Sequence, residues 1–236
     1  MVQGAGENPS QGPYPSEVEV ENVNTGTIHN VVVRDTCGDA DHGAEYGINV
    51  FNSGPVVVSN DRAIGGFSDA GIYIGGITDT GGDALKVVSN ATFLSHQGII
   101  IENSGANGII QVANNNSHHN TIPGVETEAA TGIFFNNSDD VRIRNNTVQN
   151  NGELGVDISA GSDDNRLIDN TITDNPTDLI NEGAGNCGSG NTIGTEQATR
   201  SLRAASGACN STRTCRDRRA RRVTSWRRAN GPCVVI

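Results

Sequence analysis

Acidic side chains gather in a short polar stretch, residues 35–46, which reads DTCGDADHGAEY. Asp39 and Asp41 lie two residues apart, and Glu45 follows close behind, with glycines among them. Carboxylates at this spacing in a glycine-containing loop can converge on a hard cation, and calcium takes such oxygen ligands. We therefore predict a calcium site at these three carboxylates. A solvated acidic loop is the alternative, because no full ligand series such as an EF-hand loop is present.

The chain around such residues repeats itself with a period in the low twenties. Within residues 131–172 a Gly-apolar phrase begins at Gly132 and again at Gly155, and an Asn-Thr-apolar phrase begins at Asn146 and again at Asn170. Short alternating runs separated by Asn, Gly and Asp turns at such a period are typical of a solenoid. A helical repeat would need longer apolar patterns and would not tolerate this much glycine and asparagine.

The same phrase can be followed in both directions. The entry strand, Gly-apolar-x-apolar, also begins at Gly47, Gly71 and Gly98. The asparagines that end the second strand of successive coils are Asn60, Asn90, Asn115, Asn146, Asn170 and Asn191. Stacked coils would place these amides above one another at a strand spacing of ~4.8 Å, where amide side chains form ladders.

With these motifs, residues 17–195 resemble the right-handed parallel β-helix repeat family, the pectate-lyase-like superfold. The resemblance implies an all-β, single-stranded right-handed parallel β-helix of about six or seven coils. Residues 1–16 are then an irregular N-terminal segment. Residues 196–236 have no alternation and no Asn ladder, so we predict a disordered basic tail.

Alternation within the entry strands decides which side chains face solvent. In Gly-apolar-x-apolar the apolar residues point into the helix and the x residues point outward. One outward column would contain Asn49, Tyr73, Ile100, Phe134 and Asp157, and the next Phe51, Gly75, Glu102, Asn136 and Ser159. Aromatic rings beside hydrogen-bonding groups suit sugar rings. The alternative is that a long loop or the termini cover this apolar stripe.

We accordingly predict that a glycan lies across this outward face. Its ligand-binding residues would be Tyr73, Phe134, Asn136 and Phe51. Glu102 and Asp157 would supply acid and base groups.

The coil between Gly98 and Gly132 is 34 residues long rather than 23 or 24, so about ten are inserted, and the excess falls in NNSHHNTIPGVETEAA. Long loops in repeat folds often line binding sites, so we predict that His118 reaches over the outward face as a general base. Adjacent histidines in a strand face opposite ways, so a metal shared by His118 and His119 is not expected. An exposed polar loop is the alternative.

Charge divides the chain in two. Residues 1–199 contain 6 basic and 26 acidic side chains, a net charge of −20, whereas residues 200–236 carry 10 − 1 = +9. Such an acidic repeat is a poor partner for nucleic acid. The five cysteines contain no CxxC, so neither a zinc site nor a disulfide framework is indicated.

No run of 18 apolar residues predicts a membrane span, and we expect a monomer. The first residues lack the basic and apolar regions of a signal peptide, which favours a chain that begins within a longer gene over a cytoplasmic protein. The resemblance implies an extracellular or cell-surface location, since such families are commonly exported.

Two classes of function follow from the resemblance. The first is a polysaccharide lyase, epimerase or hydrolase acting on the outer face of the first sheet. That face has no Lys or Arg, a departure from the lyase arrangement, which needs cationic stabilisation of a uronate. The second is a non-catalytic surface or structural β-helix protein that binds glycan.

Overall fold

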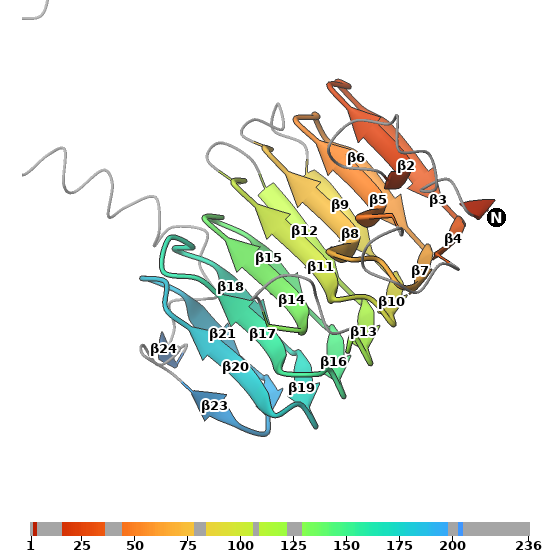
Figure 1. Ribbon diagram of the computed structural model, residues 1–236. Helices are drawn as coiled ribbons and strands as arrows, with labels where there is room; N and C mark the ends of the chain where they lie inside the picture. The colour runs from red at the N-terminus through yellow and green to blue at the C-terminus, as the bar shows by residue number, and fades with distance from the viewer. Residues whose placement is uncertain are drawn as a thin grey trace, which may run out of the picture.

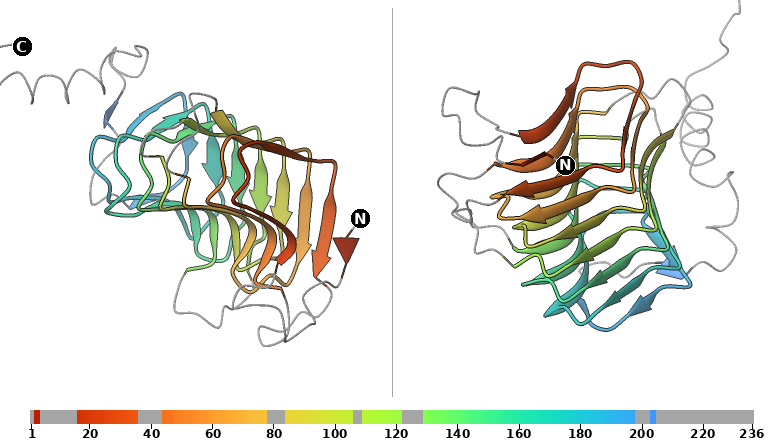
Figure 2. Two further views of the ribbon diagram at one scale, coloured as in Figure 1. Left: turned by 90° about the horizontal axis from the view of Figure 1, so that it is seen from above. Right: turned by 90° about the vertical axis from the view of Figure 1, so that its right-hand side faces the viewer.

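The computed structural model describes residues 2–3, 16–35, 44–77, 84–105, 109–121, 129–197 and 203–204. These residues contain twenty-four strands and no helix. The strands form three parallel sheets of eight strands each, and Figures 1 and 2 show the coils stacked along one axis. From β2–β4 to β20–β22, seven successive coils each add one strand to every sheet. The prediction of an all-β parallel β-helix is confirmed.

The first sheet consists of β2 (Ser16–Glu21), β5 (Tyr46–Phe51), β8 (Ala70–Gly75), β11 (Gln97–Glu102), β14 (Thr131–Asn136), β17 (Leu154–Ile158), β20 (Thr177–Asn181) and β23 (Glu196–Gln197). The second consists of β3 (Gly26–His29), β6 (Val56–Ser59), β9 (Ala84–Val88), β12 (Ile109–Ala113), β15 (Arg142–Arg144), β18 (Arg166–Ile168), β21 (Cys187–Ser189) and β24 (Arg203–Ala204). The third consists of β1 (Val2–Gln3), β4 (Val32–Asp35), β7 (Arg62–Gly65), β10 (Ala91–Phe93), β13 (Asn116–His118), β16 (Thr147–Gln149), β19 (Thr171–Thr173) and β22 (Thr192–Ile193). Strand β1 falls in the segment predicted as irregular, and β23 and β24 fall in the tail predicted as disordered.

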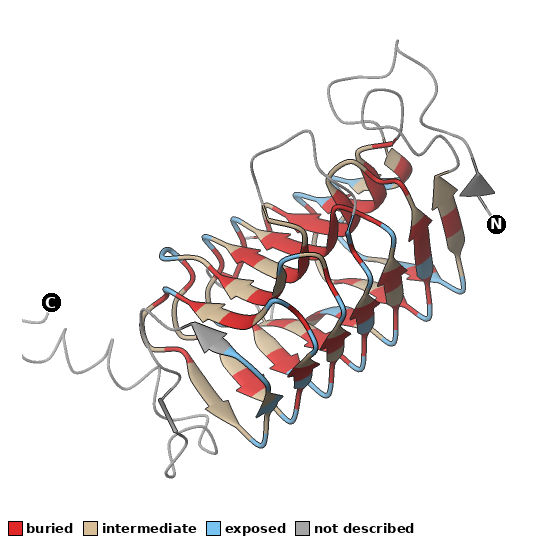
Figure 3. Cartoon of the chain, turned by 60° about the horizontal axis from the view of Figure 1, so that its bottom comes forward, coloured by how far each residue is buried: buried red, intermediate tan, exposed pale blue. Residues whose placement is uncertain are grey.

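The core is a set of aliphatic columns that run along the solenoid. In the first sheet Ile99 pairs with Ile133, which pairs with Val156, and each of the three is at most 1% exposed. Facing positions of the other sheets fill the rest of the interior, and Figure 3 shows buried residues along the strands and exposed residues at the turns. Because the interior is this narrow, each strand contributes few inward side chains, and the short strands β15, β16 and β18 contribute only one each.

The glycine at the start of each entry strand is required because neighbouring atoms lie too close to leave room for a side chain. A Cβ built on Gly71 would lie 3.0 Å from the Gly98 carbonyl oxygen and 3.2 Å from both Ala63 Cβ and Ser95 Oγ, at the corner where the third sheet turns into the first. The glycine position therefore faces inward, and the residue before it faces outward. Tyr46 shows this, since its ring packs on the outer face of the first sheet.

Buried asparagines stack between the second and third sheets, as predicted. The Asn115 N–H donates to Asn146 Oδ1 (2.9 Å), and the Asn146 N–H donates to Asn170 Oδ1 (3.0 Å). Each side-chain NH₂ also donates to a carbonyl of the preceding coil, such as Asn146 Nδ2 to the Val112 oxygen (2.9 Å). The ladder thus satisfies backbone groups that the sharp corner leaves without strand partners.

The first member of this ladder is Asp61, and the sequence interpretation that placed Asn60 there is wrong. Asn60 is exposed in the left-handed region (φ 55°), whereas Asp61 is 1% exposed. Asp61 Oδ1 accepts the Val31 N–H (2.7 Å), but its Oδ2 is buried without a hydrogen-bond partner. At the next coil Asn90 instead donates its Nδ2 to the Val58 oxygen.

Burial raises the pKa of Asp61 above its usual 3.8, although the Val31 and Ser59 amides and the nearby charge of His29 oppose the shift. We therefore expect Asp61→Asn to raise the free energy of unfolding at neutral pH by about 1–3 kcal/mol, the cost of a buried unsatisfied group. Because the folded pKa lies above the unfolded one, wild-type stability is complete below the unfolded pKa and falls as pH rises through the folded pKa. Urea unfolding from acid to neutral pH should show the advantage of Asp61→Asn growing over that window. An advantage already complete at the acid end would contradict this reading.

Two further ladders were not predicted. At the corner before the first sheet, the Asn120 and Asn151 amides donate to Asn151 and Asn175 Oδ1, respectively. At the corner after it, Ser104 N–H donates to Ser138 Oγ (3.2 Å) and Ser138 N–H donates to Ser162 Oγ (3.0 Å). The intervals between the three ladder asparagines equal those in the predicted ladder, so this signal was present in the sequence.

Candidate functional site

The predicted calcium loop lies largely outside the described residues, which include Glu45 but neither Asp39 nor Asp41. The Glu45 carbonyl oxygen accepts the N–H groups of Asp69 and Ala70 (both 3.1 Å). Within the parts of the chain that the structure describes, no group of three or more His, Cys, Asp or Glu side chains could hold a metal ion. The calcium site stays a prediction.

The outward column of the first sheet is assembled as the alternation predicted. Asn49 pairs with Tyr73, Tyr73 with Ile100, Ile100 with Phe134, and Phe134 with Asp157. The prediction that this stripe is exposed, however, is wrong for its first three members, because Asn49, Tyr73 and Ile100 are at most 9% exposed.

Tyr73 and Ile100 belong to a small apolar cluster outside the main core. The rings of Tyr46 and Tyr73 lie 4.6 Å apart between centroids, and Ala70, Ile100 and the partly buried Phe134 pack with them. Burial, and then the carboxylates of Asp69 and Glu45, raise the pKa of Tyr46 far above its usual value. The cluster therefore presents no broad exposed ring face on which a sugar could stack.

Glu102 is held at both carboxylate oxygens. The Tyr73 hydroxyl donates to Oε2 (2.6 Å), and Asn136 Nδ2 donates to Oε1 (2.7 Å). Asp157 lies in β17, which β14 separates from the Glu102 strand, β11. The structure thus brings together Glu102, Tyr73 and Asn136, and it places Asp157 apart from them. Phe51, in the same column as Glu102, is 39% exposed.

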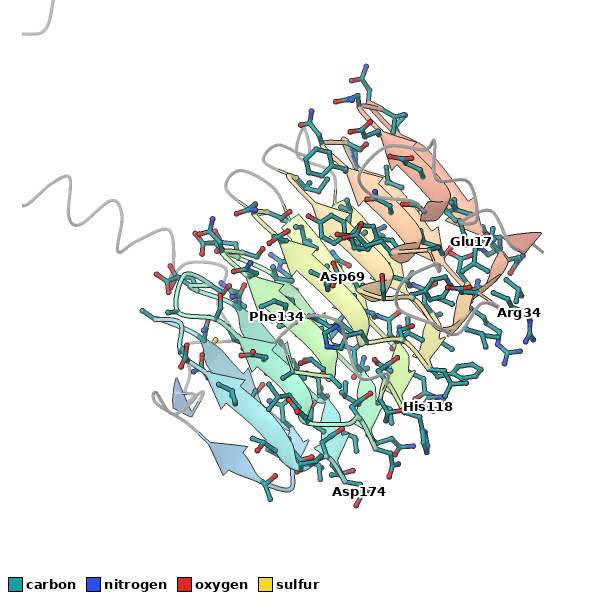
Figure 4. The ribbon with its side chains drawn as sticks, in the orientation of Figure 1. Glu17, Arg34, Asp69, His118, Phe134 and Asp174 are labelled. Atoms are coloured by element: carbon teal, nitrogen blue, oxygen red, sulfur yellow. The ribbon has the colours of Figure 1, made fainter. Side chains whose placement is uncertain are left out.

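His118 lies on the third sheet rather than above the first. It ends β13, and its ring stacks on that of Phe93 in the preceding coil (centroids 5.3 Å apart, planes 11° apart). Arg62 also lies over the Phe93 ring. Its Cζ is 6.0 Å from the ring centroid, within reach of a cation–π contact. Figure 4 shows His118 at the edge of the molecule, away from Phe134 on the first sheet.

The two adjacent histidines converge, and the expectation that they face opposite ways is wrong. His119 adopts a left-handed backbone (φ 54°), so the strand alternation ends at His118. As a result the two Nδ1 atoms lie 2.9 Å apart, with the rings edge to face. Burial, and then the charge of His119, lower the pKa of His118 below its usual 6.5. His119 itself is exposed.

Cys187, at the start of β21, is disulfide-bonded. The sequence had indicated no disulfide framework, and the other four cysteines lie outside the described residues. Across the described parts of the chain, no helix has the length and apolar character that a transmembrane helix requires.

Comparison with known proteins gives one family. Residues 12–197 match the family model described as "Periplasmic copper-binding protein (NosD)". No curated protein and no solved structure matches the chain. Because the match spans well over half of the chain and nearly all of the coils, the chain belongs to the NosD family of β-helix proteins.

Proposed function

We propose that this protein is a non-catalytic β-helix that binds copper in the periplasm. The non-catalytic role rests on the hydrogen bonds of Glu102. Its two carboxylate oxygens accept short hydrogen bonds, one from Tyr73 and one from Asn136. Two neutral donors fix this carboxylate as a hydrogen-bond acceptor within the cluster, which supports a structural role for Glu102. The family description supports copper binding in the periplasm, since it names a periplasmic, copper-binding group of proteins.

Among the described residues, histidine nitrogen is the donor that fits copper. The chain has a single methionine, at position 1, and the described cysteine is in a disulfide, so sulfur ligands are not offered there. Four histidines are described: His29, His96, His118 and His119. Imidazole nitrogen suits copper, zinc and nickel, whereas the predicted calcium would require a cage of oxygens.

Equilibrium dialysis of the purified chain against copper, zinc or calcium, followed by elemental analysis, tests this proposal. We expect copper to be retained at about one ion per chain and to outcompete zinc, following the general order of divalent affinities. In parallel, no polysaccharide should yield reducing ends or unsaturated products. Copper retention no greater than that of calcium would refute the binding role, and product release would refute the non-catalytic one.

Glycan binding on the outer face of the first sheet is the second candidate. The exposed ring of Phe51, in the same column as Glu102 and Asn136, favours it. Phe51→Ala should then abolish retention on an immobilised polysaccharide, whereas Leu94→Ala should not. Leu94 is the matched control because it is the other large apolar side chain exposed in the described residues (46%).

A further inference from the structure

The histidine pair has the geometry of two adjacent ligands of one metal. Metal–imidazole bonds of roughly 2.0–2.1 Å, as at zinc, set the separation of two bound nitrogens by simple trigonometry. Ligands at a right angle would be about 2.9 Å apart, at a tetrahedral angle about 3.3 Å, and in line about 4.1 Å. The observed Nδ1–Nδ1 distance is 2.9 Å and is set by the hydrogen bond between the two nitrogens. A metal bound in adjacent coordination positions would widen it by only a few tenths of an ångström, on the order of the difference between these geometries.

The kind of donor narrows the choice of metal ion. Imidazole suits Cu(II), nickel and zinc, whereas Cu(I) prefers sulfur. Among these divalent ions Cu(II) generally binds most tightly. The pair therefore favours the cupric ion.

The surroundings hold one imidazole and leave the other accessible. His118 is fixed by its stack on Phe93, and His119 is set by its left-handed backbone. His119 is nevertheless exposed, so an ion can reach both nitrogens from solvent. Binding would replace the hydrogen bond that now joins the two Nδ1 atoms. The proton on the donor Nδ1 would be lost to solvent while Nε2 of the same ring takes one up, so both rings stay neutral.

We propose that His118 and His119 form a two-imidazole site for Cu(II), bound through both Nδ1 atoms in adjacent coordination positions. The proposal rests on the copper-binding function proposed above and assigns it to a place on the third sheet. With two histidine ligands the remaining positions are filled by water or exchangeable ligands, so the bound ion is open to exchange.

The next coil supplies the variant that tests the site. Gln149 pairs with His118 across β13 and β16, and Asn150 has the same φ of 54° as His119. The double variant His118→Gln, His119→Asn therefore copies a pair that this fold already accommodates. It removes both imidazoles and keeps a residue suited to the left-handed backbone.

Titration of the full chain with Cu(II) chloride, followed by electron paramagnetic resonance, is the experiment. Wild type should show one tetragonal Cu(II) with coupling to two nitrogens. The double variant should lose at least about tenfold in affinity, since even disturbing a partner of a ligand costs 10–100-fold. His29→Ala, which removes an exposed histidine of the second sheet, should leave the spectrum unchanged.

Moving the histidine pair to the next coil tests the site by gain of binding. In the double-variant background, Gln149→His with Asn150→His should restore the two-nitrogen signal one coil further on. If wild type binds copper but the double variant binds it equally well, this site is refuted while the copper-binding function stands. If wild type retains no copper at all, both proposals fail.

Discussion

Asn146→Leu should lower the free energy of unfolding by roughly 3–6 kcal/mol, because two or three buried polar groups would each lose a partner worth about 1–3 kcal/mol. Asn146 is 1% exposed and lies in the middle of the ladder. Its Oδ1 accepts the N–H and the Nδ2 of Asn115 (2.9 and 3.0 Å), and its Nδ2 donates to Asn170 Oδ1 and to the Val112 oxygen (both 2.9 Å). Leucine has similar bulk and can make none of these bonds.

The neighbouring Asn145 is the matched control for this change. It is exposed, with φ 52°, so Asn145→Gly removes an amide of the same type while glycine tolerates the backbone. We expect its unfolding midpoint in urea to stay within error of wild type. Equal midpoints for Asn146→Leu and wild type would show that the ladder is incidental to stability.

Gly132→Ala should destabilise the fold by about 3 kcal/mol, at the upper end of what overpacking costs, or prevent folding. A Cβ at this position would lie 2.6 Å from Asn151 Nδ2 and 2.7 Å from the Gly155 oxygen. The first contact disturbs the ladder before the first sheet, and the second pushes the next coil away. Because the coils are packed in series, a local displacement propagates to the neighbouring coil interface.

Gly26→Ala controls for the loss of glycine itself. Its Cβ would meet only Val56 Cγ2 at 3.8 Å and Val23 Cγ2 at 3.9 Å, ordinary contact distances. Circular dichroism during heating should give Gly26→Ala a melting temperature at or slightly above that of wild type, as expected where alanine restricts the unfolded chain. A Gly132→Ala protein as stable as Gly26→Ala would contradict the close approach of the coils.

The electrostatics of the outer faces also bear on function. On the second sheet Arg142 pairs in register with Arg166, so like charges lie one strand apart. On the first sheet the carboxylate of Glu102 is satisfied by neutral donors. Neither arrangement resembles a reactive centre, whereas the histidine pair joins two metal-ligating groups at an accessible edge.

The sequence by itself determined the fold. Each coil has a glycine at its entry, alternating aliphatic residues and an asparagine at the same position. A parallel stack brings each of these residues into contact with its equivalent in the next coil. The inward positions of Ile99, Ile133 and Val156, and the ladder partners of Asn146, could therefore be read from spacing alone.

Tertiary structure decided the arrangement of the corners, where strand alternation ends, and what covers the outer faces. The convergence of His118 and His119 follows from a left-handed φ at His119. Histidine is enriched in this region, but it indicates the conformation less strongly than glycine does. At this corner the left-handed residue comes directly before the ladder residue. Asn60 is the left-handed residue, so Asp61 enters the ladder. The burial of Tyr73 depends on how residues outside its own coil pack, and strand alternation can tell which way a side chain points but not what lies over it.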